Sequence, residues 1–341
     1  FGLNGLDIYY LSTRIGRPER RKMDVALTHF DTNKIATLLD NGGPLQGVFS
    51  DFEYRPEQVQ MLEAVTSAIF EGSNLVVEGG TGVGKSMAYL LPAAIYAASK
   101  GQRVVISTNT INLQEQLVRK DIPVICNALE EANIVNKGVI TSAVLKGRSN
   151  YLCLKRWSYL SKGETLSQDE ARLIGKTSIW LQNTTSGDRG EINISGRDTN
   201  TWAKVSAADK GWCSGLRESG VCFLKSSREK AEQAHIIVVN HALLLSDVMH
   251  GGSLIPDYQH LIIDEAHNLE DEATSQFGFH VTPERLSEVI DQQGRLITNT
   301  TAHLISANAS QAVRQSGESA FSTIANLTPH LRELWAQMWV Q

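Results

Sequence analysis

Residues 79–86 read GGTGVGKS, and this segment limits the possible folds more than any other part of the chain. It satisfies the pattern G-x-x-x-x-G-K-[ST] between the apolar segment NLVVEG and the helix-forming segment KSMAYLLPAAIYAASK. Glycine suits such a loop because the backbone must approach phosphate closely and direct its N–H groups toward it. The alternative is a strand–helix turn that binds nothing, but both flanks have the pattern that a phosphate-binding loop requires. The segment therefore predicts an α/β domain with a phosphate site.

The backbone and the side chains of this loop have separate predicted roles. The backbone N–H groups surround the phosphates, and the helix that follows adds its N-terminal dipole. Lys85 supplies a mobile cation for the terminal phosphates, and the Ser86 hydroxyl is a ligand for Mg²⁺. The predicted phosphate-binding residues are Gly79, Thr81, Gly82, Gly84, Lys85 and Ser86.

A second motif, HLIIDEAH at residues 260–267, places acidic groups at the end of another apolar strand. Two adjacent carboxylates are costly there unless a cation or a proton neutralises them. Asp264 is predicted to hold Mg²⁺ through water, Glu265 to polarise the attacking water, and His267 to link this site to another surface. Alone, the acidic pair would indicate a solvated turn, but a phosphate loop needs an acidic partner. We therefore interpret the two motifs as parts of one site.

Apolar strands alternate with helices on both sides of a polar middle segment. The runs NLVVEG, RVVIST, HIIVVN and HLIIDEAH are expected to be buried strands of a parallel sheet covered by helices on both faces. Residues 1–45 are predicted to form a leader with one helix, and residues 53–72 a helix that ends at Gly72. Residues 150–225 are polar and hold three of the six tryptophans between Trp157 and Trp202, so we expect an insertion with a small core of its own. The later segments TPERLSEVI and TPHLRELWAQMW are each predicted to begin a helix with a Thr cap and Pro.

Length and charge exclude some classes of protein. The 341 residues are enough for more than one hydrophobic core. A net charge of −5 excludes a broadly basic surface, so any nucleic acid must bind along a local path. No apolar run reaches the roughly 18 residues that cross a membrane, and the first residues lack the pattern of a secretory signal. We therefore expect no membrane partner.

The motifs have the form of a superfamily 2 helicase of the DEAH type, and the chain resembles the XPD/DinG family of ATP-dependent DNA helicases. YRPEQVQM resembles the family's adenine-recognising segment, with Arg55 and Gln58 in the matching places. VISTNTINLQEQL resembles motif Ia, which lies against single-stranded DNA, and IIVVNHALLLSD resembles the family phrase that precedes the DEAH strand. DTNKIATLLDNGGPL resembles the lead-in of bacterial DinG-like proteins, some of which carry an upstream exonuclease domain. The first three of these motifs, with the phosphate loop and the acidic motif, cover roughly residues 45–275 and occur in the same order as in the family.

The resemblance implies a RecA-like motor domain at residues 46–149 and 226–275, an iron–sulfur-type insertion at 150–225, and the start of a helical arch domain at 276–341. It also implies Mg-ATP hydrolysis coupled to 5′→3′ movement on single-stranded or forked DNA, in repair or replication, in the bacterial cytoplasm. The second motor domain would lie outside this chain, which is therefore expected to bind ATP weakly and hydrolyse it poorly alone. The alternative is a P-loop ATPase or nucleotide-gated DNA-binding module that does not unwind.

The cysteines of the insertion match part of the family's cluster site. By resemblance, Cys153 in KGRSNYLC and Cys213 and Cys222 in WCSGLRESGVC are ligands of an iron–sulfur cluster, and four cysteines normally hold a [4Fe–4S] centre. The family usually has a further cysteine between the last two, which this chain lacks, and Cys126 lies in an apolar helical segment expected to be core. Three outcomes remain open: a cluster with a non-cysteine fourth ligand, a labile or three-iron cluster, or no cluster.

The predicted DNA-contacting surface is the loop at residues 108–114, together with the insertion and the arch. Polar side chains and backbone N–H groups there would hold phosphates without reading bases. Trp202 and Trp212 are candidates for stacking on bases, but we favour their forming the core of the insertion.

Overall fold

The computed structural model describes residues 7–13, 33–46, 48, 53–80, 84–163, 166–194, 196, 198–208, 222–278 and 310–338. The chain divides into two compact units, Phe1–Gln276 and Phe277–Gln341. The first unit contains the sheet and both predicted site motifs.

The described strands form a six-stranded sheet in the order β2-β1-β6-β3-β5-β4. The strands are β1 (Asp7–Thr13), β2 (Leu75–Gly79), β3 (Val104–Thr108), β4 (Ser142–Val144), β5 (Ile236–Asn240) and β6 (His260–Ile263). Strands β4, β5, β3 and β6 pair in parallel, whereas β1 is antiparallel to both β2 and β6. The sheet is therefore mostly parallel, which confirms the α/β class and part of the expected parallel pairing.

Strand β1 was not predicted, and it corrects the expectation that the sheet is entirely parallel. Residues 7–13 pair with β2 from Asp7 opposite Gly79, and with β6 from Tyr10 opposite Ile263. The segment that sequence analysis treated as a leader with one helix thus also contributes a strand. An antiparallel strand can enter such a sheet because pairing requires only backbone hydrogen bonds, and mixed sheets are common.

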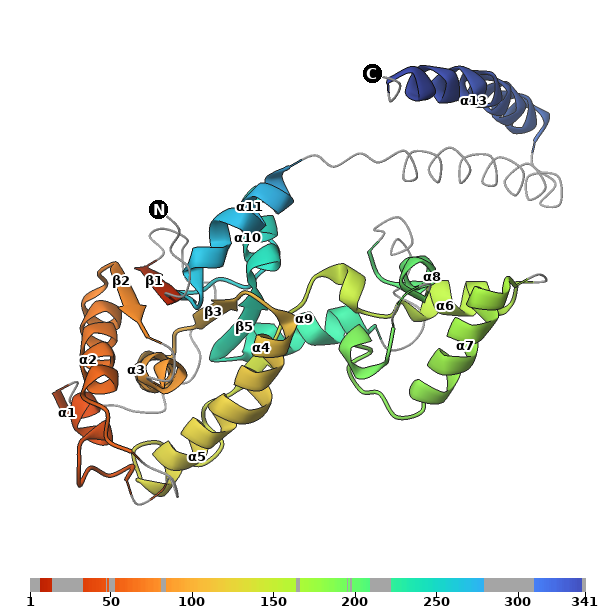
Figure 1. Ribbon diagram of the computed structural model, residues 1–341. Coiled ribbons are helices and arrows are strands. Elements are labelled where there is room, and N and C mark those ends of the chain that lie inside the picture. The colour runs from red at the N-terminus through yellow and green to blue at the C-terminus, as the bar shows by residue number, and fades with distance from the viewer. Residues whose placement is uncertain are drawn as a thin grey trace. The chain divides into compact units, whose positions relative to one another are not determined.

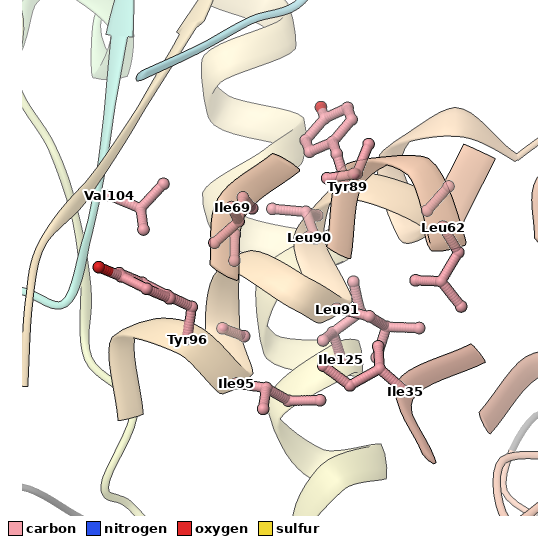
Figure 2. Packing of buried hydrophobic residues seen from close by; sticks show 14 of the residues in the cluster. Ile35, Leu62, Ile69, Tyr89, Leu90, Leu91, Ile95, Tyr96, Val104 and Ile125 are labelled. Atoms are coloured by element: carbon pink, nitrogen blue, oxygen red, sulfur yellow. The ribbon is translucent and has the colours of Figure 1, made fainter. Parts of the chain in front are cut away.

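Side chains of the central strands alternate between two hydrophobic cores, as expected for a sheet covered on both faces. One core joins Val104, Ile106 and Ile262 to helices α2 (Pro56–Glu71), α3 (Lys85–Lys100) and α5 (Ile122–Glu131). Figure 2 shows this core, in which α3 contributes Leu90, Leu91 and Ile95. The other core joins Val105 and Ile263 to α9 (Phe223–Gln233) and α10 (His241–Met249). The two layers hold the strand ends that carry the site.

Strand β2 differs from the expected buried strand. It pairs only with β1 among the described strands, its residues alternate between half-buried and exposed, and Val76 is 64% exposed. A strand at the edge of a sheet with one covered face has this pattern, although its sequence is as apolar as that of a central strand.

Most helix bounds agree with the sequence. Helix α2 has proline in its first turn and ends at Gly72, whose φ of 74° is left-handed, so the predicted stop is confirmed. The short helix α1 (Asn33–Ala36) continues into the 3₁₀ turn Thr37–Leu39. Helix α4 (Ile111–Gln116) continues through a π-helical turn at Leu117–Asp121 into α5. The 3₁₀ turn Ala266–Asn268 and helix α11 (Leu269–Phe277) follow β6.

The segment predicted to be an insertion, residues 150–225, contains a hydrophobic cluster distinct from the two that flank the sheet. Its helices α6 (Leu154–Ser161), α7 (Gln168–Trp180) and α8 (Asp198–Val205) form a separate group in Figure 1, with 3₁₀ turns at Arg148–Asn150 and Arg189–Glu191. The core centres on Trp202, which is 1% exposed and donates from Nε1 to the Ser149 carbonyl at 2.7 Å. The preference for a core role is confirmed for Trp202, and Trp212 lies outside the described residues.

The described part of the second unit is helix α13 (Gln311–Met338). Pro329 lies inside this helix, so the predicted helix start at Thr328 is wrong. The helix runs on through the proline, which removes one backbone donor without ending it. The other predicted start, TPERLSEVI, lies outside the described residues. In the described ranges, no helix combines the length and the apolar character that crossing a membrane requires.

Candidate nucleotide site

The phosphate loop leaves the end of β2 and enters α3. Gly79 is the last residue of β2, Lys85 is the first of α3, and Thr81 and Gly82 lie outside the described residues. Gly84 has a φ of 78°, and a Cβ atom there would lie 2.2 Å from Nε2 of Gln58. Glycine is favoured at position 84 because φ lies in the left-handed region, and a Cβ atom there would displace the amide of Gln58.

Of the two residues expected to recognise adenine, one contacts the phosphate loop. Gln58 in α2 is 7% exposed, and its Nε2 donates to the Gly84 carbonyl at 2.7 Å. Arg55 precedes α2, and its guanidinium forms an ion pair with Glu53 at 2.6 Å while 40% of the side chain is exposed. Gln58 thus fixes the end of the loop, and Arg55 remains at the surface beside it.

Lys85 lies between the loop and the acidic motif. Its Nζ donates to the Gly79 carbonyl at 3.3 Å. Burial lowers the pKa of Lys85, and the nearby charges of Asp264 and Glu265 oppose that shift. Ser86 follows in the first turn of α3 and is half-buried. The structure therefore brings the predicted lysine and the two predicted carboxylates together.

Asp264 is held in place from two sides. The residue is 8% exposed, and its backbone N–H donates to the Ser107 carbonyl at 2.8 Å, which extends the pairing of β3 and β6. Its Oδ2 accepts a hydrogen bond at 2.9 Å from the hydroxyl of Tyr89, a fully buried residue of α3. A buried carboxylate needs such donors because it has lost water.

Glu265 has a strained backbone. Its φ of 55° and ψ of 44° place a non-glycine residue in the left-handed region. Strain of this kind costs about 1–3 kcal/mol and is concentrated at functional sites. The Glu265 carbonyl accepts from the Asn268 N–H at 3.0 Å, and exposed His267 lies in the same short turn, with Nε2 2.9 Å from Nδ2 of Asn268.

Three buried polar residues around this site carry no role in the sequence-based predictions. Tyr89 follows Lys85 by one helical turn, so spacing alone was a signal that both share a face of α3. Ser107 ends the apolar run of β3, and His241 begins α10; both are fully buried, with the Ser107 hydroxyl 2.7 Å from Nδ1 of His241. Burial lowers the pKa of His241, and the backbone of Glu265 opposes that shift. No sequence pattern indicates the serine–histidine pair.

The predicted DNA-contacting loop is only partly accessible. Thr108 and Gln114, at its two ends, are fully buried, and Gln114 lies against the Val238 carbonyl with a distance of 3.5 Å from its Nε2. Thr110 and Ile111 between them are exposed. The exposed part of the loop is therefore narrower than the predicted DNA-contacting segment, because Thr108 belongs to the central strand β3 and Gln114 to the buried face of α4.

Cys153 and Cys222 occupy matching positions, each directly before a helix. They precede α6 and α9 with similar extended backbone angles, and neither side chain makes a capping hydrogen bond. Both pack against the core of the insertion. The third expected ligand, Cys213, lies outside the described residues, within which no cluster of three metal-binding side chains occurs. Cys126 in α5 is half-buried and packs against the core, rather than forming part of it as predicted, and burial raises its thiol pKa to about 11.

A buried ion-pair cluster joins the insertion to the sheet. Lys146 follows β4 and is 3% exposed, and its Nζ contacts Glu115 in α4 at 2.6 Å and also Asp188 in the insertion. Burial lowers the pKa of Lys146, but hydrogen bonds to the two carboxylates outweigh it, so the pKa is raised. The lysine therefore remains charged and ties the two regions together.

Comparisons with known proteins agree with this geometry. The DEAD/DEAH box helicase model matches residues 55–145, and the DEAD_2 model matches residues 203–286. The chain is 35% identical over 263 residues to the ATP-dependent DNA helicase YoaA of Haemophilus influenzae, an alignment covering 75% of this chain and 39% of the relative. It is 34% identical over 276 residues to the ATP-dependent helicase DinG of Mycobacterium tuberculosis, covering 75% and 40%. By these matches the chain is similar to the DinG-like helicases.

Some relatives are named as helicases and others as exonucleases. The 3′-5′ exonuclease DinG of Bacillus subtilis is 28% identical over 256 residues, covering 75% of this chain and 27% of that protein. The chain spans about two fifths of the length of the helicase relatives above. The matched part includes the phosphate loop and the acidic motif, which are the segments that sequence analysis assigned to the nucleotide site.

Proposed function

We propose that this chain is the ATP-binding motor half of a DinG-like DNA helicase, which hydrolyses Mg-ATP and couples hydrolysis to movement on single-stranded DNA. The observation that carries the proposal is the convergence of Lys85, at the start of α3, with Asp264 and Glu265, at the end of β6. A lysine after a glycine loop, facing an acidic pair, is the arrangement that binds and cleaves nucleoside triphosphates.

Each residue has a role that follows from its chemistry. Lys85 binds the terminal phosphates, and the Ser86 hydroxyl provides a hard oxygen ligand of the kind that Mg²⁺ prefers. The Asp264 carboxylate holds the cation through water, and Glu265 accepts a proton from the attacking water. When bound, Mg²⁺ supplies positive charge to the phosphate oxygens. Gln58 keeps the end of the loop in place through Gly84. Arg55, which precedes α2 and is partly exposed, is proposed to contact the nucleotide base.

The proposed single-stranded DNA path passes Thr110 and Ile111, which are exposed at the start of α4. Ser107, three residues before Thr110 in the chain, contacts His241 through its hydroxyl and accepts the backbone N–H of Asp264. This proximity supports coupling between the nucleotide site and DNA. The proposal also includes 5′→3′ polarity, a preference for forked DNA, a role in repair and location in a bacterial cytoplasm. These four points come from the similarity to bacterial helicases.

The proposed domains are a RecA-like motor at residues 46–149 and 226–275, an iron–sulfur-type insertion at 150–225, and the start of an arch at 276–341. Separate cores for the sheet and the insertion support the first two, and the division after Gln276 supports the third. The relatives' greater length is consistent with a second motor domain elsewhere in the protein. In the insertion, Cys153 and Cys222 are available to a cluster, which would supply structural cross-linking there.

The proposal is tested by measuring ATP binding and hydrolysis with and without single-stranded DNA, in this chain and in the full-length protein. Lys85→Ala should abolish both, and the full-length protein should show DNA-stimulated hydrolysis and unwind a forked duplex. DNA-stimulated hydrolysis without unwinding would support the non-unwinding ATPase instead. Absence of nucleotide binding by the unchanged chain and by the full-length protein would refute both.

Iron and acid-labile sulfide on anaerobically purified protein test the insertion. Cys153→Ser and Cys222→Ser should each remove bound iron, whereas Cys126→Ser, in α5, is the matched control and should not. Equal iron in all four proteins, or none in any, would refute the cluster.

A further inference from the structure

Helix α3 contains two buried tyrosines whose hydroxyls have different partners. Tyr89 is fully buried and donates to Oδ2 of Asp264 at 2.9 Å, whereas Tyr96 is 6% exposed and donates to Gln102. Figure 2 shows both side chains on the same helix, with their hydroxyls directed to different regions. A buried tyrosine usually finds a partner for its hydroxyl, so the presence of a bond is ordinary. The identity of the acceptor distinguishes Tyr89.

The position of Tyr89 in α3 places its hydroxyl beside the nucleotide site. The helix begins at Lys85, and one turn separates that residue from Tyr89. The same helix therefore presents three groups: a cation at Lys85, a hydroxyl at Ser86, and a hydrogen-bond donor at Tyr89. The Tyr89 hydroxyl bonds to Asp264, which follows β6. Movement of α3 would move all three together.

A hydrogen bond to one carboxylate oxygen fixes the direction of the other. Asp264 is also anchored through its backbone N–H to Ser107, so the bond from Tyr89 restrains the remaining side-chain rotation. Ligating carboxylates in proteins are commonly oriented by such outer-shell hydrogen bonds, and losing one typically costs about 10–100-fold in metal affinity or activity. A phenylalanine would fill the same space but provide no donor.

We propose that Tyr89 is a positioning residue for the magnesium site, because its hydroxyl orients the Asp264 carboxylate toward the cation that accompanies the nucleotide. The inference rests on the proposed function, since it requires Asp264 to face Mg²⁺. It assigns to α3 a role beyond binding phosphate: the helix that carries Lys85 and Ser86 also sets the orientation of the acidic motif. Tyr89 acts through Asp264 and is not assigned any contact with the nucleotide.

The test compares Tyr89→Phe with Tyr96→Phe, a matched control in the same helix. Each substitution removes one buried hydroxyl and leaves the ring, but only Tyr89 bonds to the acidic motif. The affinity of the 341-residue chain for a fluorescent, non-hydrolysable ATP analogue is measured with Mg²⁺ and with EDTA. The ratio of the two affinities reports the contribution of the cation, and thermal unfolding confirms that each variant is folded.

We expect Tyr89→Phe to reduce this ratio by about 10-fold while leaving the affinity in EDTA unchanged. Tyr96→Phe should keep the ratio of the unchanged chain. Equal ratios for both variants would overturn the inference, as would an equal loss of affinity with and without Mg²⁺, which would indicate a packing role. If the unchanged chain itself binds no better with Mg²⁺, the proposed nucleotide site fails, and the inference fails with it.

A double-mutant cycle tests whether Tyr89 acts through Asp264. Asp264→Asn keeps an acceptor for the tyrosine hydroxyl but removes the charge that attracts the cation. In that background, Tyr89→Phe should cause no further change in the ratio, and an additive change would overturn the inference. Should Tyr89→Phe alone fail to fold, folding of the double variant would show that the hydroxyl serves the carboxylate. Failure of the double variant as well would assign Tyr89 to packing.

Discussion

The buried His260 should make the sheet sensitive to mild acid. His260 begins β6, is 2% exposed, and neither ring nitrogen has a hydrogen-bond partner in the described part of the chain. Its ring lies edge-on to Tyr96, with ring centroids 4.4 Å apart. Burial lowers the pKa of His260 from 6.5 to about 4, because the charged imidazolium loses its water.

The sign and size of the effect follow from linkage. The folded state binds fewer protons than the unfolded state between the two pKa values, so stability is complete above pH 6.5 and falls as the pH falls toward 4. The full loss is about 3 kcal/mol, and about 2 kcal/mol of it is expected between pH 7.5 and pH 5. This is a large fraction of a typical folding free energy of about 5–15 kcal/mol.

The assay is urea unfolding followed by far-ultraviolet circular dichroism at pH 7.5, 6.5, 5.5 and 5, for the unchanged chain and for His260→Leu. Leucine is close in volume, apolar and unable to titrate, so the variant should lose less stability over this range by about 2 kcal/mol. Other titrating groups contribute to both curves and cancel in the difference. If the two proteins lose equal stability between pH 7.5 and 5, burial does not lower the pKa of His260 enough to make folding sensitive to acid.

Three further predictions concern the phosphate loop, the junction of the insertion, and its core. Gly84→Ala should weaken binding of the ATP analogue more than 10-fold in the same fluorescence titration, because the new Cβ collides with Gln58 and φ is positive. An affinity equal to that of the unchanged chain would refute this reasoning. Lys146→Met should reduce the free energy of unfolding by about 3 kcal/mol, because Glu115 and Asp188 lose the cation that neutralises them. Urea unfolding measures this loss, and a value under about 1 kcal/mol would show that the two carboxylates are solvated. Trp202→Phe should lower the free energy of unfolding by about 3 kcal/mol, because it leaves a cavity and removes the hydrogen bond from Nε1. Amide hydrogens in α6 and α8 should then exchange faster, and unchanged exchange would show that the core does not depend on the indole.

The outcome of the predictions differs between local and long-range features of the site. The glycine loop between a strand and a helix, and the acidic pair at a strand end, were recognisable because a few adjacent residues specify them. Gln58 was expected near the nucleotide, but its bond to Gly84 was not. Tyr89 escaped notice because a tyrosine in an apolar helix has the same pattern whether its hydroxyl bonds to Gln102 or to Asp264. The burial of Thr108 likewise depends on neighbours outside its own segment.

The sequence by itself determined helices α2 and α3, the stop of α2 at Gly72 and the two site motifs, because periodicity, capping and positive φ are set within a few residues. Only the tertiary structure decided that residues 7–13 enter the sheet between β2 and β6, that β2 is a half-exposed edge, and that α13 continues through Pro329. It also decided which oxygen of Asp264 receives the hydroxyl of Tyr89, a residue 175 positions away. Pairing and packing between distant segments depend on the shapes of all the elements at once, and no local pattern encodes them.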